Sequence, residues 1–185
     1  MNLITKRVHM NRCNGREVKQ LTLDRDFNVP DARPDALQIM KEQGEVQIEE
    51  VHMMEGKASV KGLLHFQILY ASDGDIPVSE MTGTIPFEET ISLPQAKAED
   101  EISVQAEIGD LKSELINSRK LGMKAIVVLN VTAGSVCDGE GAIDIEGGED
   151  IYTKKRTAEV SYLVFSKKDT LRVRDEWKIP GTKDA

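Results

Sequence analysis

An apolar segment at residues 123–131, preceded by the polar run Asn117, Ser118, Arg119 and Lys120, constrains the fold of this chain most. A half-buried strand alternates apolar and polar residues, whereas this segment is apolar on both faces. We therefore predict a central strand that is buried on both faces. The polar run before it predicts a turn in which Asn117 and Ser118 cap the backbone. We expect Arg119 to pair with a carboxylate in that turn.

Most of the remaining chain repeats its apolar residues with a period of two, as strands do. The clearest case covers residues 58–70, where one face is apolar and Leu63 and Leu69 make the other face partly apolar as well. This pattern favours a second central strand. Counted along the chain, the segments predict an all-β protein of about ten antiparallel strands, arranged as a sandwich or a barrel.

One short helix is expected near residues 34–43, because Pro34 suits a first helical turn and Gly44 would end the helix. The pair Glu49-Glu50 interrupts the alternation and predicts a bulge. Glu55-Gly56 has the composition of a two-residue hairpin turn. Pro86 places its strand at a sheet edge or at a bulge.

Glycines divide other parts of the chain. Gly15 predicts a turn between strands at residues 4–10 and 18–23, and Gly109-Asp110 predicts another turn. Residues 134–150 are rich in glycine and acids, and we expect a mobile loop there around a weak strand at 142–145. Two further strands are predicted at residues 157–165 and 170–179.

The bulk composition excludes several classes of function. The 185 residues carry a net charge of −8, which disfavours a broad nucleic-acid surface because phosphate contacts need clustered Lys and Arg. No apolar stretch has the length of a membrane span or of a signal-peptide core. The two cysteines, Cys13 and Cys137, make neither a disulfide framework nor a zinc site.

No catalytic, cofactor-binding or metal site is expected from the residues themselves. His9, His52 and His65 are scattered without ligand spacing, and Ser113, Ser118 and Ser161 lack the context of a nucleophile. The acids between residues 42 and 55 are expected to form a solvated face, and the acids of 138–150 lack the order of a calcium loop. The basic residues at 154–156 and 167–168 are expected to be solvated strand ends, with a docking patch as the alternative.

Several segments, taken in their order and spacing, resemble the SPOCS domain of SipL-like spore-coat morphogenetic proteins. The similarity runs from about residue 25 to 178 and includes the runs 28–35, 44–50, 62–70, 85–89, 115–121 and 158–164. The residues that we take as markers of this fold are Pro30, Pro34, Gly62, Phe66, Tyr70, Pro86, Phe87, Asn117, Ser118, Arg119 and Lys120.

The resemblance implies a non-enzymatic scaffolding role in the spore envelope, in the mother-cell cytoplasm at the forespore surface. The implied partners are other spore-coat proteins, among them the ATPase that polymerises at that surface, or further copies of the chain. Family members often repeat the domain and end in a LysM module, through which the contact with the ATPase mainly runs. A carbohydrate- or peptidoglycan-binding β module is the alternative, although its stacking candidates are only Trp177, Tyr70, Tyr152 and Tyr162.

The resemblance and the strand pattern together suggest three regions. Residues 1–24 are expected to be an N-terminal strand extension that could pair with another protein by β-augmentation. Residues 25–178 would form the SPOCS-like domain. Residues 179–185 would begin a linker or a second repeat, because residues 177–185 echo residues 27–36, so that the natural chain is expected to continue past Ala185.

Overall fold

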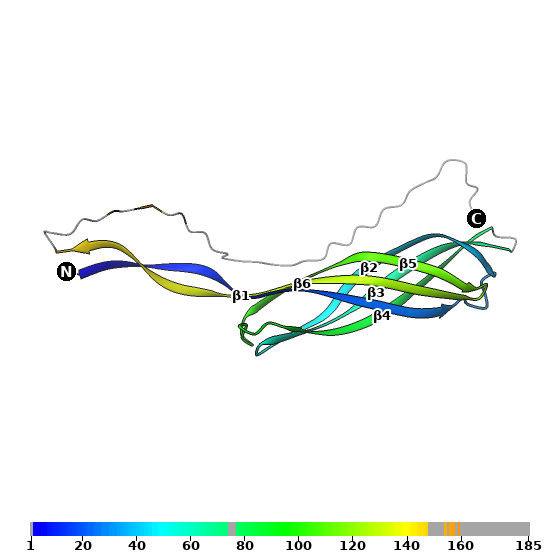
Figure 1. Ribbon diagram of the computed structural model, residues 1–185, viewed down its shortest axis with the longest axis horizontal. Helices are drawn as coiled ribbons and strands as arrows, with labels where there is room; N and C mark the ends of the chain where they lie inside the picture. The colour runs from blue at the N-terminus through cyan, green and yellow to red at the C-terminus, as the bar shows by residue number, and fades with distance from the viewer. Residues whose placement is uncertain (1, 74–76, 148–153, 155, 158, 160–185) are drawn as a thin grey trace, which may run out of the picture.

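The computed structural model describes residues 2–73, 77–147, 154, 156–157 and 159. In this part of the chain the protein is all-β, as predicted, with two three-stranded antiparallel sheets in the orders β1-β6-β5 and β2-β3-β4 (Figure 1). The strands are β1 (Asn2–Asn28), β2 (Ala36–Met54), β3 (Lys57–Ser72), β4 (Val78–Ser92), β5 (Glu101–Asn117) and β6 (Lys120–Glu146). The described residues thus contain six long strands rather than about ten short ones.

The apolar core lies between the two sheets. Strand β3 alternates strictly between buried and half-buried residues, and β6 is buried at alternate positions from Leu121 to Ala133. Two aromatic rings contact each other between the sheets: Phe27 of β1 lies edge-on to Phe66 of β3, with 4.6 Å between the ring centroids. Both strands that we predicted to be central are confirmed in that position, since β3 and β6 each lie between two neighbours. The predicted burial of both faces at residues 123–131 is wrong, because the second face is half-buried and Lys124 on it is exposed.

Polar contacts join the sheets along their edges. On one side the Ser113 hydroxyl of β5 donates to Glu42 of β2 at 3.1 Å. On the other side Lys19 of β1 lies 3.3 Å from Glu89 of β4. These two contacts link β5 to β2 and β1 to β4 on either side of the core.

The short helix that we predicted near residues 34–43 is wrong. Strand β2 begins at Ala36 and pairs with β3 from there to Met54, and Leu37 and Met40 are exposed. A two-turn helix is marginal in water unless it docks against the core. Pairing with the central strand β3 instead satisfies the backbone groups on one side of the strand, and we take this as the reason that the extended form prevails.

Two predicted turns are bulges inside long strands. The register of β1 against β6 shifts between Cys13 and Gly15, and the register of β5 shifts between Ile108 and Asp110. Neither strand reverses direction at these points. A glycine near a bulge and a glycine in a turn give similar sequence signals, because both positions favour a residue without a side chain.

Other local predictions are confirmed. A register shift falls between Ile48 and Glu50, where the bulge was expected, and Gly56 has a φ of 70° in the turn between β2 and β3. Strand β4, which contains Pro86, is an edge strand. The strands predicted at residues 157–165 and 170–179, and the repeat at 177–185, lie outside the described residues. No described helix is long and apolar enough to cross a membrane.

Candidate functional site

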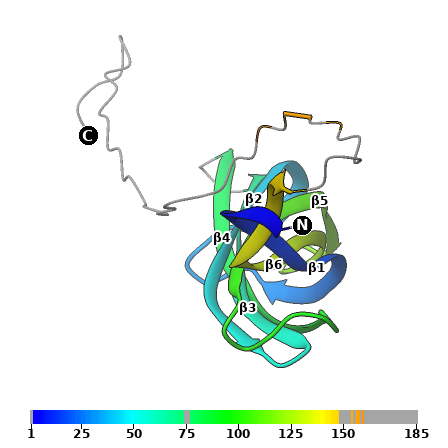
Figure 2. The same ribbon diagram turned by 90° about the vertical axis from the view of Figure 1, so that its left-hand side faces the viewer.

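The described part of the molecule has a slender extension, which we call the arm. It consists of residues 2–13 of β1 and residues 135–146 of β6, and the remaining described strands form the body (Figure 1). The last pairing of β5 with β6 joins Glu101 to Gly134. Beyond that point β1 and β6 pair only with each other among the described strands, and they twist about each other as they leave the body (Figure 2).

The side chains of the arm are exposed or half-buried, and none of them is buried. Its twelve residues on each strand span roughly 40 Å at about 3.4 Å per residue. An isolated two-stranded ribbon is at best marginally stable in water. Large apolar side chains nevertheless lie exposed along it, namely Leu3, Ile4, Met10, Val136 and Ile143. The arm therefore offers a neighbour apolar surface and two strand edges that no other described strand pairs with.

A polar cluster, which we call the junction, fixes the arm to the body. The Asn14 side-chain amide donates to both carboxylate oxygens of Asp100, at 3.0 and 2.9 Å, and to the Ser135 hydroxyl at 3.0 Å. The backbone N–H of Lys97 donates to the same carboxylate at 2.9 Å. These donors, with the Lys97 N–H first, hold the pKa of Asp100 below its usual range. The junction thus binds β1, β6 and the loop before β5 at one point.

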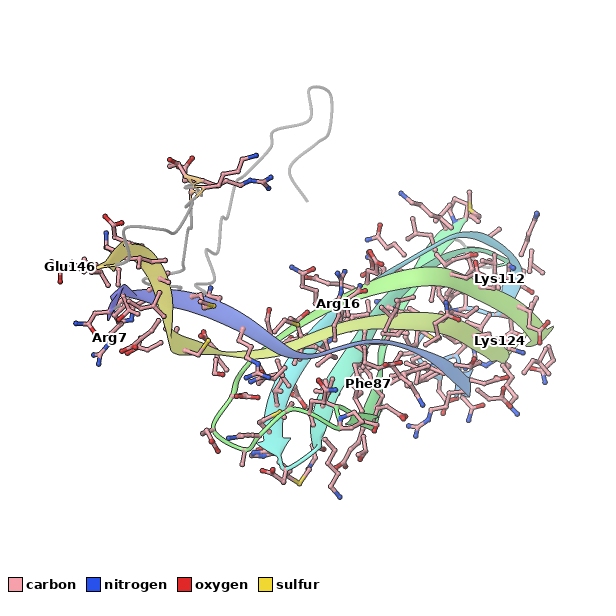
Figure 3. The ribbon with its side chains drawn as sticks, turned by 60° about the vertical axis from the view of Figure 1, so that its left-hand side comes forward. Arg7, Arg16, Phe87, Lys112, Lys124 and Glu146 are labelled. Atoms are coloured by element: carbon pink, nitrogen blue, oxygen red, sulfur yellow. The ribbon has the colours of Figure 1, made fainter. Side chains whose placement is uncertain are left out.

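The two strands of the arm carry opposite charge. Residues 2–13 contain Lys6, Arg7 and Arg12 and no acid, whereas residues 135–146 contain acids and no Lys or Arg. The acids are Asp138, Glu140, Asp144 and Glu146. Figure 3 shows Arg7 and Glu146 at the free end of the arm, far from Lys112 and Lys124 at the other end of the body. One strand edge of the arm is therefore basic and the other is acidic.

Some of this charge is paired within the arm. The His9 imidazole is hydrogen-bonded to Asp138 through Nδ1, and Arg7 lies opposite Glu140 in the register. Lys6 lies opposite Gly141 and Arg12 opposite Ser135. Neither Lys6 nor Arg12 forms an ion pair with a described residue. Their charges are accordingly available on the basic edge.

The polar run that we predicted to be a turn connects β5 to β6 at the end of the body opposite the arm. The Asn117 side chain accepts a hydrogen bond from the Arg119 N–H at 2.9 Å, and the Ser118 hydroxyl donates to Asp35 at 2.9 Å. Lys120 pairs with Asp26 at 2.6 Å. The capped turn thus also holds the connection between β1 and β2.

Arg119 is the centre of this corner. Its Nη1 donates to the Arg33 carbonyl at 2.7 Å and to Asp35 at 3.1 Å. Its Nη2 donates to the Val29 carbonyl and to Asp31, both at 3.2 Å. Pro30 and Pro34 lie in the connection that these bonds span, so the structure places Arg119 in a structural role there.

The other predicted marker residues lie in the sheet β2-β3-β4. Tyr70 is fully buried, and its hydroxyl donates to the Pro34 carbonyl at 3.4 Å. Gly62 lies opposite Phe87, and Phe66 lies opposite Gly83. Pro86 lies opposite Leu63. The marker residues therefore form two groups in the body, and none of them lies on the arm.

The described residues do not converge into a reactive centre. No group of three or more His, Cys, Asp or Glu side chains in this part of the chain could hold a metal ion. His52 lies 2.7 Å from Glu50, and His65 lies 3.2 Å from Gln47, on exposed strand surface. Phe66, Tyr70 and Phe87 are buried and form no stacking row. Trp177, Tyr152 and Tyr162 lie outside the described residues, so the carbohydrate-binding alternative gains no support here.

Sequence reasoning missed half of the arm. We predicted a loop at residues 134–150 around a weak strand at 142–145. The strand is confirmed, but it is part of β6, which continues to Glu146 because β1 pairs with it along this region. The N-terminal extension was expected at residues 1–24, whereas β1 passes residues 24 and 25 without a break. The available signal was charge: a basic strand pattern at one end of the sequence and an acidic segment more than 120 residues later.

One comparison with known proteins finds a family model that matches part of the chain. Residues 35–116 match the family model described as SipL, SPOCS domain. The matched range runs from the start of β2 to the end of β5, and the resemblance inferred from the sequence is confirmed over it. No curated protein and no solved structure matches the chain.

Proposed function

We propose that this chain, whose residues 35–116 carry the SPOCS-domain match, is a non-catalytic protein-interaction module of a spore-envelope morphogenetic protein. The arm is the observation that carries the proposal. It exposes two strand edges and five large apolar side chains at a distance from the body. Unpaired strand edges are templates for another strand, and proteins that do not use them shorten or cover them.

β-augmentation supplies the mechanism. A partner strand that adds to an edge gains main-chain hydrogen bonds, while side-chain contacts give specificity. The junction supports this use, since Asn14, Asp100 and Ser135 fix the arm to the body. A fixed arm loses less conformational entropy on binding than a free tail would.

The match to the SPOCS domain supports the choice of partners and location. We propose that the partners are other spore-coat proteins, among them the polymerising ATPase of the coat basement, or further copies of the chain. The site of action would be the mother-cell cytoplasm at the forespore surface. The acidic net charge of −8 favours basic partner surfaces.

A shortened-arm variant tests this function. Removing residues 2–12 and 136–146 leaves Asn14, Asp100 and Ser135 in place, so that the body keeps its junction. In sporulating cells, a fluorescent fusion of the full chain should gather at the forespore surface, and the shortened variant should stay dispersed. A full chain carrying Lys41→Glu and Lys57→Glu on the body serves as the control and should gather like the unmodified chain. Equal recruitment of the shortened variant would refute the proposed role of the arm.

A further inference from the structure

We infer that the arm joins copies of this chain head to tail, with the basic β1 edge of one arm beside the acidic β6 edge of the next copy's arm. This inference rests on the proposed function and names the partner of the arm as a second copy. Its basis is the charge of the two strands. The charged side chains of residues 2–13 are all basic, and those of residues 135–146 are all acidic.

Cross-strand neighbours decide which edges can meet. Side chains opposite each other on adjacent strands interact, and like charges there are destabilising. A contact between two β1 edges would place Lys6, Arg7 and Arg12 beside the same residues of the other copy. A contact between two β6 edges would do the same with acids. Only the contact of β1 with β6 brings opposite charges together along the whole arm.

No described strand pairs with either of these two edges. In the sheet β1-β6-β5, β1 is an edge strand, and β5 ends its pairing with β6 at Gly134. The outer side of β1 and the outer side of residues 135–146 therefore have no partner strand in the described part of the chain. Apolar residues on both strands, including Leu3 and Val136, add surface that a neighbour can bury.

The contact uses two different surfaces of each copy, so it does not close on itself. Such a heterologous contact produces a ring or an open chain, whereas a symmetric dimer needs the same surface on both copies. In the assembled sheet every basic β1 would lie between two acidic β6 strands, its own and that of the neighbour. The charge pattern inside one arm is thus continued by the next.

The shape of the molecule sets the orientation of the arms. The body is wider than the arm (Figure 1), so neighbouring arms that point the same way would bring their bodies into collision. Arms that point in opposite directions keep the bodies at opposite ends. In that arrangement β1 runs parallel to the neighbour's β6, because β1 runs toward its own body and β6 runs away from its own.

Charge reversal in the full chain tests this arrangement. The first variant carries Lys6→Glu and Arg12→Glu, whose direct neighbours within the arm are the uncharged Gly141 and Ser135. The second carries Asp144→Lys and Glu146→Lys, opposite Ile4 and Asn2. In the first variant both edges carry net negative charge, and in the second the new lysines offset Asp138 and Glu140, so that β6 no longer attracts a basic edge. Each variant should therefore associate about tenfold more weakly than the unmodified chain. A mixture of the two should recover association, since the unmodified acidic β6 edge of the first variant then meets the unmodified basic β1 edge of the second.

Sedimentation velocity supplies the readout. The average mass of the unmodified chain should rise with concentration past that of a dimer at about 0.01 M salt, and this rise should largely disappear at about 1 M salt, where the Debye length is about 3 Å. The Lys41→Glu, Lys57→Glu variant changes net charge by the same amount as the first variant. Both lysines are exposed on the body, and the variant should behave like the unmodified chain.

Three results would overturn the inference. They are a chain that stays monomeric at all concentrations, an association that stops at a dimer, and a mixture that associates no better than its two components. If the shortened-arm variant still fails to reach the forespore surface in any of these cases, the proposed interaction function stands and the partner of the arm is another protein.

Discussion

Gly62 of β3 lies directly opposite Phe87 of β4, and the Phe87 ring fills the space that a side chain at position 62 would occupy. A Cβ atom at Gly62 would lie 2.6 Å from the ring and 2.6 Å from the Gln47 carbonyl oxygen. Phe66 and Gly83 repeat the arrangement in reverse on the same two strands. Each ring covers a glycine across the sheet, which ties the register of β3 to that of β4.

We therefore expect Gly62→Ala to destabilise the body. The new methyl group meets a backbone carbonyl that cannot move without breaking the pairing of β2 with β3, and overpacking of this kind costs about 1–3 kcal/mol. Urea unfolding followed by circular dichroism measures the change. Gly141→Ala is the matched control, since no atom lies within 4 Å of its Cβ position, and it should stay within about 0.5 kcal/mol of the unmodified chain. Equal midpoints for both variants would show that the close approach at Gly62 carries no energetic weight.

Arg119→Lys should also weaken the fold. The guanidinium bonds to the carbonyls of Arg33 and Val29 as well as to Asp35 and Asp31, and an ammonium group cannot reach all four acceptors from one position. Hydrogen bonds from charged groups contribute about 1.5–3 kcal/mol each when partly buried, so we expect a loss of about 1–3 kcal/mol. Thermal unfolding of the purified variant would measure it.

The control for Arg119 is a lysine whose ion pair is exposed. Lys124 lies 3.6 Å from Asp24, and both side chains are more than 60% exposed, at 63% and 64%. Lys124→Met should change stability by about 0.5 kcal/mol or less, because exposed pairs contribute little. A loss at Lys124 as large as that at Arg119 would argue that general charge balance, and not the corner, is responsible.

Local sequence signals sufficed for the central strands and for the turns at their ends. The apolar patterns that predict these two strands lie entirely within residues 58–70 and 123–131. The turn at Gly56 could be predicted from that glycine alone, because the turn requires a positive φ there. The helix prediction for residues 34–43 was wrong, because the positions of Leu37 and Met40 are compatible with a helix as well as with a strand. Pairing with β3, whose backbone needs a partner strand along that edge, favours the strand.

The arm could not be predicted locally. Its acidic half indicates only a weak strand at residues 142–145, and its pairing depends on residues more than 120 positions away in the sequence. The bond between His9 and Asp138 joins residues 129 positions apart. Complementary charge between residues 2–13 and 135–146 is the one signal in the sequence that links them. The junction residue Asp100 was missed for the same reason, since its partners Asn14 and Ser135 come from both strands.

The junction should respond to acid. The pKa of Asp100 is lowered in the folded chain, so its contribution to stability is present above its ordinary value of 3.8 and is lost as the pH falls through the lower folded value. We expect the protection of amides in residues 10–16, taken relative to their intrinsic exchange rates, to fall as the pH drops below about 4. Asp100→Asn should exchange faster already at neutral pH and should depend less on pH in this range.

A matched comparison separates the junction from general acid unfolding. Amides of residues 64–70 in β3, whose buried side chains lie in a separate core cluster, should keep their protection in Asp100→Asn at neutral pH, because their pairing with β2 and β4 does not involve the junction. If β3 and the junction lose protection together, Asp100 supports the whole body. If neither changes, the bonds from Asn14 and Lys97 contribute nothing to the attachment of the arm.

The two cysteines give a final prediction about the arm. Cys13 lies opposite Gly134 and Cys137 lies opposite Met10, so about 10 Å separate the two positions along the ribbon, and they face opposite sides of it. A disulfide needs Cα atoms within about 7 Å, and the paired strands cannot supply that without breaking the arm. A mild oxidant should therefore link separate chains through their thiols and leave few internal bridges.

Non-reducing electrophoresis followed by peptide mapping distinguishes these products. Cys13 is exposed and Cys137 is half-buried, so cross-links through Cys13 should form first, and Cys13→Ser should remove most of the early product. Recovery of a peptide that joins Cys13 to Cys137 within one monomer would mean that β1 and β6 separate in this region. In that case the arm would not be the paired two-stranded ribbon on which head-to-tail assembly depends.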